Sequence, residues 1–129
     1  MNAEITKDKW ERFLKTLNTK RYEWKTRIEV LSSEFGDQVL SVGLPLNGIT
    51  LEVKGGKDKI NISVGESSDL HQTHTILDPS RIAFLAADAS HGDIVDIEQN
   101  DGTKTLITFI EPMGVMVGFA EVEMIAAPL

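Results

Sequence analysis

The sequence predicts an α+β protein in which an N-terminal amphipathic helix packs on a mainly antiparallel, curled sheet or partly open barrel. Apolar residues recur with helical spacing over residues 6–19 and then with a spacing of two through residues 22–125. Turn-forming residues divide the second region into about six to eight short strands. A chain of 129 residues has the size of one hydrophobic core, so we expect a single domain over residues 1–129.

The helix is predicted from one apolar face and a capping residue. Thr6 is of a type that caps helix N-termini, and Asp8 would lie in the first turn, where negative charge stabilises the helix dipole. Four apolar residues follow at positions i, i+3, i+4 and i+7: Trp10, Phe13, Leu14 and Leu17. This spacing lines one helical face with apolar groups, which we expect to pack on the sheet.

The first strands are predicted from alternation of apolar and polar residues. Residues 24–30 alternate over one strand, and residues 39–42 form a short strand that ends before Pro45. Residues 49–53 and 60–64 alternate on either side of the pair Gly55-Gly56. Because glycine reaches the positive φ that tight hairpin turns need, these two segments predict a β-hairpin.

The later strands follow the same logic. Residues 81–86 are apolar on both faces, which is typical of a central strand. Residues 95–98 and 106–110 flank an Asp-Gly turn at residues 100–102 and predict a second hairpin. Residues 119–125 are expected to form a last strand, with a helix as the alternative.

The charge distribution limits the class of partner. The net charge of −7 divides into +4 over residues 1–27 and −11 over residues 28–129. An acidic body repels phosphate backbones, so we expect no nucleic-acid partner. The basic N-terminal segment is expected to lie against the acidic body, and contact with an acidic partner is the alternative.

Two further features predict a cytoplasmic protein outside the membrane. The chain has no cysteine, which excludes disulfides and thiol chemistry and is typical of a reducing compartment. The N-terminus has no apolar signal segment, and the charge-free run over residues 112–120 is far shorter than the roughly 20 residues of a membrane-spanning helix.

The first candidate metal site is the segment HQTHTILDP. Histidine and carboxylate side chains are common metal ligands, and the donors available here are Asp69, His71, His74 and Asp78. The threonines and isoleucine of the segment favour a strand. On a strand, positions three apart point to opposite faces, so the two histidines are expected to diverge unless a bulge intervenes.

The second candidate is the segment DASHGDIVD. Asp88, His91 and Asp93 lie around an expected turn, where they can converge on a cation. The same residue types also form turns without binding anything. A proton relay of Ser90, His91 and Asp93 is a further arrangement, but neighbours in sequence rarely face one another correctly.

Two segments, LPLNGITLEVKGGKDKINISVG and THTILDPSRI, resemble a family of small bacterial proteins catalogued as a domain of unknown function. The similarity spans residues 8–110 and implies a shared fold. The family supplies no catalytic or binding residue. The matching residues are Trp10, Phe13, Leu14, Leu44, Pro45, Leu46, Gly48, Ile49, Thr73, His74, Thr75, Ile76 and Pro79.

The sequence favours a soluble, non-enzymatic binding module that forms a homo-oligomer, with an unknown protein or small molecule as a further partner and no cofactor. It contains no coherent catalytic constellation, and the apolar residues 113–119 are expected to extend a contact surface. The alternative is a metal-binding protein or metal-dependent enzyme that uses His74 with His71 or His91 and a nearby aspartate. A third hypothesis is a pocket for a small apolar ligand.

Overall fold

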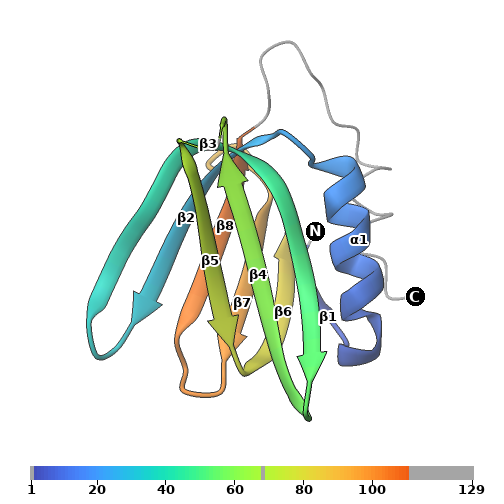
Figure 1. The fold of residues 1–129 in the computed structure, drawn as a ribbon. Coiled ribbons are helices and arrows are strands. Elements are labelled where there is room, and N and C mark those ends of the chain that lie inside the picture. Colours follow the sequence, from blue (N-terminus) through green and yellow to red (C-terminus); the bar gives the residue numbers. More distant parts are fainter. Residues whose placement is uncertain (1, 68, 111–129) are drawn as a thin grey trace.

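A computed structural model describes residues 2–67 and 69–110 (Figure 1). The predicted strand over residues 119–125 and the apolar residues 113–119 lie outside this part of the chain. The elements are β1 (Asn2–Ile5), the 3₁₀ turn η1 (Lys7–Lys9), α1 (Trp10–Lys20), β2 (Lys25–Ser32), β3 (Gly36–Lys54), β4 (Lys57–Gly65), β5 (His71–Leu77), β6 (Pro79–Leu85), β7 (Ile94–Gln99) and β8 (Lys104–Ile110).

The described strands form one open sheet of eight strands in the order β1-β6-β7-β8-β2-β3-β4-β5. Every neighbouring pair is antiparallel. The prediction of one N-terminal helix on a mainly antiparallel sheet is therefore confirmed. Strand β1 was not predicted, because its four residues are too few to show a period; it pairs with β6 from Asn2–Leu85 to Ile5–Ile82.

Strand β3 folds the sheet over on itself by changing its partner. Its first half pairs with β2 as far as Pro45, and its second half pairs with β4 from Leu46 onward. Strands β4 and β5 consequently lie in front of β2 and β8 (Figure 1). The two layers meet where Nε2 of His74 on β5 lies 3.4 Å from Oγ1 of Thr105 on β8.

The prediction that a short strand ends before Pro45 is wrong, because β3 runs through the proline as one strand of 19 residues. Proline cannot donate a ladder hydrogen bond and is tolerated at irregular positions of a sheet. Pro45 occupies such a position, at the change from β2 to β4. A register shift next to Gly43, which has a φ of 85°, lies just before it.

The predicted apolar face of α1 is confirmed. Trp10, Phe13, Leu14 and Leu17 are each no more than 2% exposed. The ring of Phe13 meets Phe84 of β6 edge-on, with 6.0 Å between the centroids. Helix α1 therefore packs its predicted face into the core that the folded sheet encloses.

The N-terminal end of the helix differs from the prediction. A 3₁₀ turn comes first, and the α-helix begins at Trp10. Thr6 precedes the turn, but its side chain caps no backbone N–H of the described chain. Its carbonyl accepts from the Lys9 amide instead, and the Trp10 indole donates to the carbonyl of Ile5 at 2.9 Å. The helix start is thus held by the backbone and by Trp10.

Both predicted hairpins are confirmed. Gly55 and Gly56, with φ values of 63° and 77°, form the two-residue turn between β3 and β4. Gly102, with a φ of 89°, lies in the turn between β7 and β8. These are the conformations for which glycine is preferred. No helix among the described residues is long and apolar enough to cross a membrane.

Candidate functional site

The two histidines of HQTHTILDP lie on opposite faces of β5. His71 is exposed on the outer face, where its Nε2 lies 2.6 Å from the Ser63 hydroxyl oxygen. His74 is half-buried on the inner face beside Thr105, and burial lowers the pKa of His74 below its ordinary value. A regular strand separates these side chains, so the structure does not bring His71 and His74 together.

The aspartates that flank β5 have separate positions. Asp78 forms the corner between β5 and β6 with a φ of 49°, a region that aspartate tolerates better than most residues. Its amide donates to the carbonyl of Asp58 at 3.2 Å, and its carbonyl accepts from the Asn100 amide at 3.0 Å. Asp69 lies in the turn before β5. Asp78 therefore stabilises this corner through the hydrogen bonds of its backbone.

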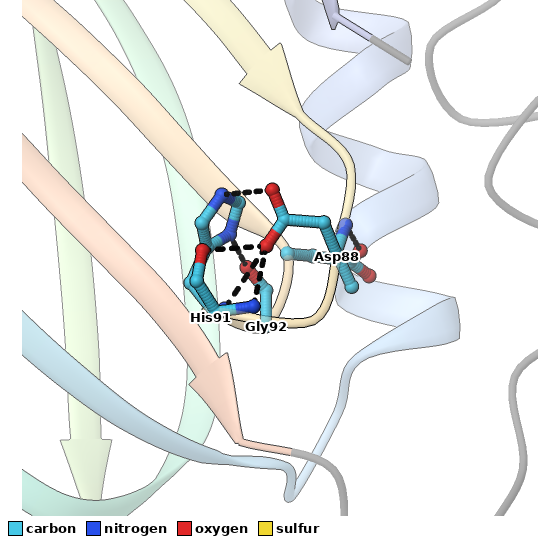
Figure 2. A network of polar contacts seen from close by, with 6 residues as sticks. Asp88, His91 and Gly92 are labelled. Atoms are coloured by element: carbon cyan, nitrogen blue, oxygen red, sulfur yellow. Dashed lines mark hydrogen bonds and ion pairs between the residues drawn. The ribbon is translucent and has the colours of Figure 1, made fainter.

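The loop between β6 and β7 brings Asp88 and His91 together (Figure 2). One carboxylate oxygen of Asp88 accepts from the Ser90 amide and hydroxyl, both at 2.7 Å, and from the His91 amide at 3.2 Å. The other oxygen lies 3.2 Å from His91 Nε2, and His91 Nδ1 lies 2.7 Å from the carbonyl oxygen of Gly92. The bonds from Ser90 are the main reason that the pKa of Asp88 is lowered. The Asp88 carboxylate therefore stabilises the loop to which it belongs.

The Asp93 carboxylate is buried and bonds to Arg21 and to the Ala87 amide of the same loop, apart from the Asp88–His91 pair. It is 4% exposed, and its Oδ2 lies 2.7 Å from Nη2 of the fully buried Arg21. Its Oδ1 accepts from the Ala87 amide at 2.8 Å, and the Arg21 guanidinium stacks on the Trp24 ring at 4.5 Å. The expected convergence of Asp88, His91 and Asp93 is therefore not formed.

The predicted proton relay of Ser90, His91 and Asp93 is not formed in this loop. The Ser90 hydroxyl donates to Asp88, and the carboxylate beside His91 is Asp88, whereas Asp93 binds Arg21. Across residues 2–67 and 69–110, no three His, Asp or Glu side chains are grouped to hold a metal ion. Of the predicted ligands, only Asp88 and His91 lie together, and the others are separate.

A feature that the sequence interpretation missed is the free edge of β5. Asp78 donates to Asp58, and the Glu66 amide donates to the carbonyl of Leu70 at 3.0 Å. Hydrogen-bonded and non-bonded pairs alternate along an antiparallel ladder. The even-numbered residues of β5 therefore bond to β4. The outward backbone groups belong to His71, Thr73, Thr75 and Leu77, and no described strand pairs with them.

Within the part of the chain that the structure describes, this edge has none of the features that usually protect an edge strand. Natural edges are shortened, bulged or marked with lysine and proline. Strand β5 has seven residues, no proline and no Asp, Glu, Lys or Arg, and its register with β4 is continuous. Leu77 is 57% exposed at its end. The lack of charge over residues 71–77 is visible in the sequence, but it does not identify an edge by itself, because residues 38–51 are also uncharged.

A hollow of about 300 Å³ adjoins the start of β5. It lies between β5 and the first half of β3, whose second side is unpaired within the described sheet. The Ser41 hydroxyl is buried there without a hydrogen-bond partner among the described residues. The hollow is lined by Ser41, Val42, Leu44, Leu70, His71 and Gln72, together with Asp69. Apolar side chains and the unpartnered Ser41 hydroxyl therefore lie beside an unpaired strand.

Comparison with known proteins places the chain in a family. The profile of a family of unknown function, DUF5335, matches residues 1–117, so the chain belongs to this family. The resemblance to a family of unknown function is thereby confirmed. Comparisons with curated proteins and with solved structures give no match.

Proposed function

We propose that this member of the DUF5335 family is a non-enzymatic, cytoplasmic binding module, and that the free edge of β5 takes up an extended segment of a partner as an additional strand. The observation that carries the proposal is the row of four outward-facing residues on an uncharged edge. Strand addition uses main-chain hydrogen bonds for affinity and nearby pockets for specificity. The hollow at the start of β5 is such a pocket.

The positions of the polar groups support binding over catalysis. Asp93 is buried against Arg21, Asp88 is bonded to Ser90 within its loop, and His71 lies against Ser63. A catalytic acid or base has to reach a substrate in a cleft. These side chains instead hold loops and strands together, and no arrangement in the described chain favours the metal-dependent alternative.

The fold is consistent with this proposal when the α+β domain is regarded as a partly open barrel. Helix α1 contacts Phe84 of β6 and Ile49 of β3, and so covers one opening of the folded sheet. The other opening lies between β5 and the first half of β3. A strand added to β5 would enter this second opening.

The proposal can be tested with a fluorescently labelled peptide of residues 71–77 as the added strand. Binding is measured by fluorescence anisotropy to wild-type protein, Thr75→Ala and Thr75→Pro. Both substitutions remove the Thr75 hydroxyl, which donates to Asn61 at 2.8 Å, but only proline removes the outward N–H. One hydrogen bond contributes about 0.5–1.5 kcal/mol net, so we expect proline to weaken binding up to about tenfold relative to alanine.

A lysine pair provides a control that does not depend on proline. Thr75 pairs with Asn61, and Asn61 pairs with Thr50 two strands away, so both threonines lie in one row of the outer face. Lysine at position 75 is expected to block the peptide, whereas Thr50→Lys adds the same charge away from the edge and should leave binding intact. Equal binding by all four variants, each folded by circular dichroism, would rule out strand addition at β5.

A further inference from the structure

We propose that the added strand is β5 of a second copy of this chain, paired antiparallel about a twofold axis at His74. This inference rests on the proposed strand addition and names its partner. A twofold interface brings the same surface of both copies together, so the edge must be complementary to itself. Three properties of β5 meet this requirement.

The first property is the position of the outward residues. His71, Thr73, Thr75 and Leu77 are symmetric about residue 74. An antiparallel pairing centred on His74 places Thr73 opposite Thr75 of the second copy, and His71 opposite Leu77 of the second copy. Because bonded residues of both strands then face each other, all four outward residues of each copy join the ladder.

The second property is the absence of repulsion. The chain carries a net charge of −7, so two copies repel each other over most of their surface. Strand β5 has no Asp, Glu, Lys or Arg, and pairs of threonine residues are favourable across strands. Burial lowers the pKa of His74, so two neutral rings meet at the axis at neutral pH.

The third property is the end of the strand. In this register Leu77 of the second copy comes opposite His71, which borders the hollow with Leu44 and Leu70. The leucine that is 57% exposed in a single chain would then lie next to a residue that lines the hollow. A register centred on Thr75 would instead bring Pro79, which has no N–H, opposite His71. The register about His74 is therefore favoured over this neighbour.

Cysteine cross-linking tests the register directly, because the chain contains no cysteine of its own. Thr73→Cys and Thr75→Cys proteins are mixed and treated with oxidised glutathione, which accepts the two electrons released when two thiols form a disulfide. Directly opposite residues are about 5.5 Å apart between Cα atoms, within the range of a disulfide. We expect the mixed cross-linked dimer to exceed either self-linked dimer several-fold. A mixture of Thr73→Cys with Thr50→Cys is the control and should give no such product.

Sedimentation at roughly 50 µM, where a micromolar dimer is mostly assembled, supplies the second readout. We expect a dimer for the wild type and Thr75→Ala, and a monomer for Thr75→Lys. A monomeric wild type, or no preference for the mixed disulfide, would overturn the pairing with a second copy. If the labelled peptide still binds in that case, strand addition stands and only its partner is wrong. If the peptide does not bind either, the proposed function fails as well.

Discussion

The folded sheet has two openings, and the molecule treats them differently. The opening between β1 and the second half of β3 is covered by α1, whose Asn18 side chain donates to the Ile49 carbonyl and accepts from the Ile49 amide at 2.9 and 2.7 Å. The opening between β5 and the first half of β3 has no covering element among the described residues. Within the described residues, one opening is thus covered by α1, whereas the other is bordered by the free edge of β5.

The chemistry of the two sides differs in the same way. On the α1 side, Arg21 pairs with Asp93 in the core, and Glu4 on the edge strand β1 pairs with Arg81. The printed side-chain contacts of β5 itself involve no Asp, Glu, Lys or Arg; Thr75, for example, bonds to Asn61. Charges guard the short β1 edge, whereas the β5 edge carries none. This difference supports the proposal that an added strand pairs with β5 and not with β1.

The largest expected effect is the loss of the buried ion pair on the α1 side. Asp93→Asn leaves the buried Arg21 beside a neutral amide, and breaking a buried pair in this way costs about 3–5 kcal/mol. Urea unfolding followed by circular dichroism measures the change. If the free energy of unfolding falls by less than about 1 kcal/mol, the usual contribution of an exposed pair, then the buried ion pair does not distinguish the α1 side from the β5 side.

The turn that leads into β5 is the next most sensitive feature. Gly65 has a φ of 152°, and a Cβ there would lie 2.2 Å from the Leu70 carbonyl oxygen. Forcing an extra methyl group into such a place costs about 1–3 kcal/mol beyond the backbone strain. Gly36→Ala is the matched control, because its φ of 76° carries the strain while nothing lies within 4 Å of its Cβ. We expect urea unfolding to show Gly65→Ala as the less stable variant; equal losses would contradict the steric argument.

A smaller effect is expected from pH at the contact between the two layers. Burial lowers the pKa of His74 below 6.5. The imidazole therefore binds a proton less tightly in the folded protein than in the unfolded chain. The contribution of His74 to stability is therefore complete above pH 6.5 and falls as the pH drops through 6.5 toward the lower folded value. Unfolding at pH 7.5 and 5.5 should show a smaller difference for His74→Gln than for the wild type. An equal pH difference for His74→Gln and the wild type would contradict this role of His74.

The smallest effect is expected at the guarded β1 edge. Glu4 and Arg81 are both exposed, and surface ion pairs contribute about 0–1 kcal/mol. Glu4→Gln should leave the urea midpoint nearly unchanged. If the charges of Glu4 and Arg81 keep β1 from pairing with another chain, Glu4→Gln should associate further than the wild type in sedimentation. If sedimentation is unchanged, the short length of β1, and not these charges, is what protects this edge.

Much of this architecture was predictable because it is local. The buried face of α1 follows from a spacing of three and four residues, and the hairpin at Gly55 from two adjacent glycines. Even the separation of His71 from His74 followed from the period of a strand. Strand β1 and the continuity of β3 through Pro45 were not predictable, since a four-residue segment shows no period and a proline usually ends a strand.

The candidate site was less accessible to sequence interpretation. Asp88, His91 and Asp93 stand close together in the chain, which suggested a shared site. The structure divides them because Asp93 has a partner 72 residues away, Arg21, which no local pattern connects with it. The hydrogen bonds from Ser90 to Asp88 were within reach, because aspartate and serine form such turns readily.

The sequence by itself determined which side chains face inward, where the turns fall and that the run from His71 to Leu77 carries no charge. These properties depend on residues that are close in the chain, through the periods of helix and strand. Only the tertiary structure decided which strand became an edge, which opening α1 covers and which carboxylate is buried. Those outcomes depend on pairings between distant segments, where many arrangements satisfy the same local pattern and packing selects one.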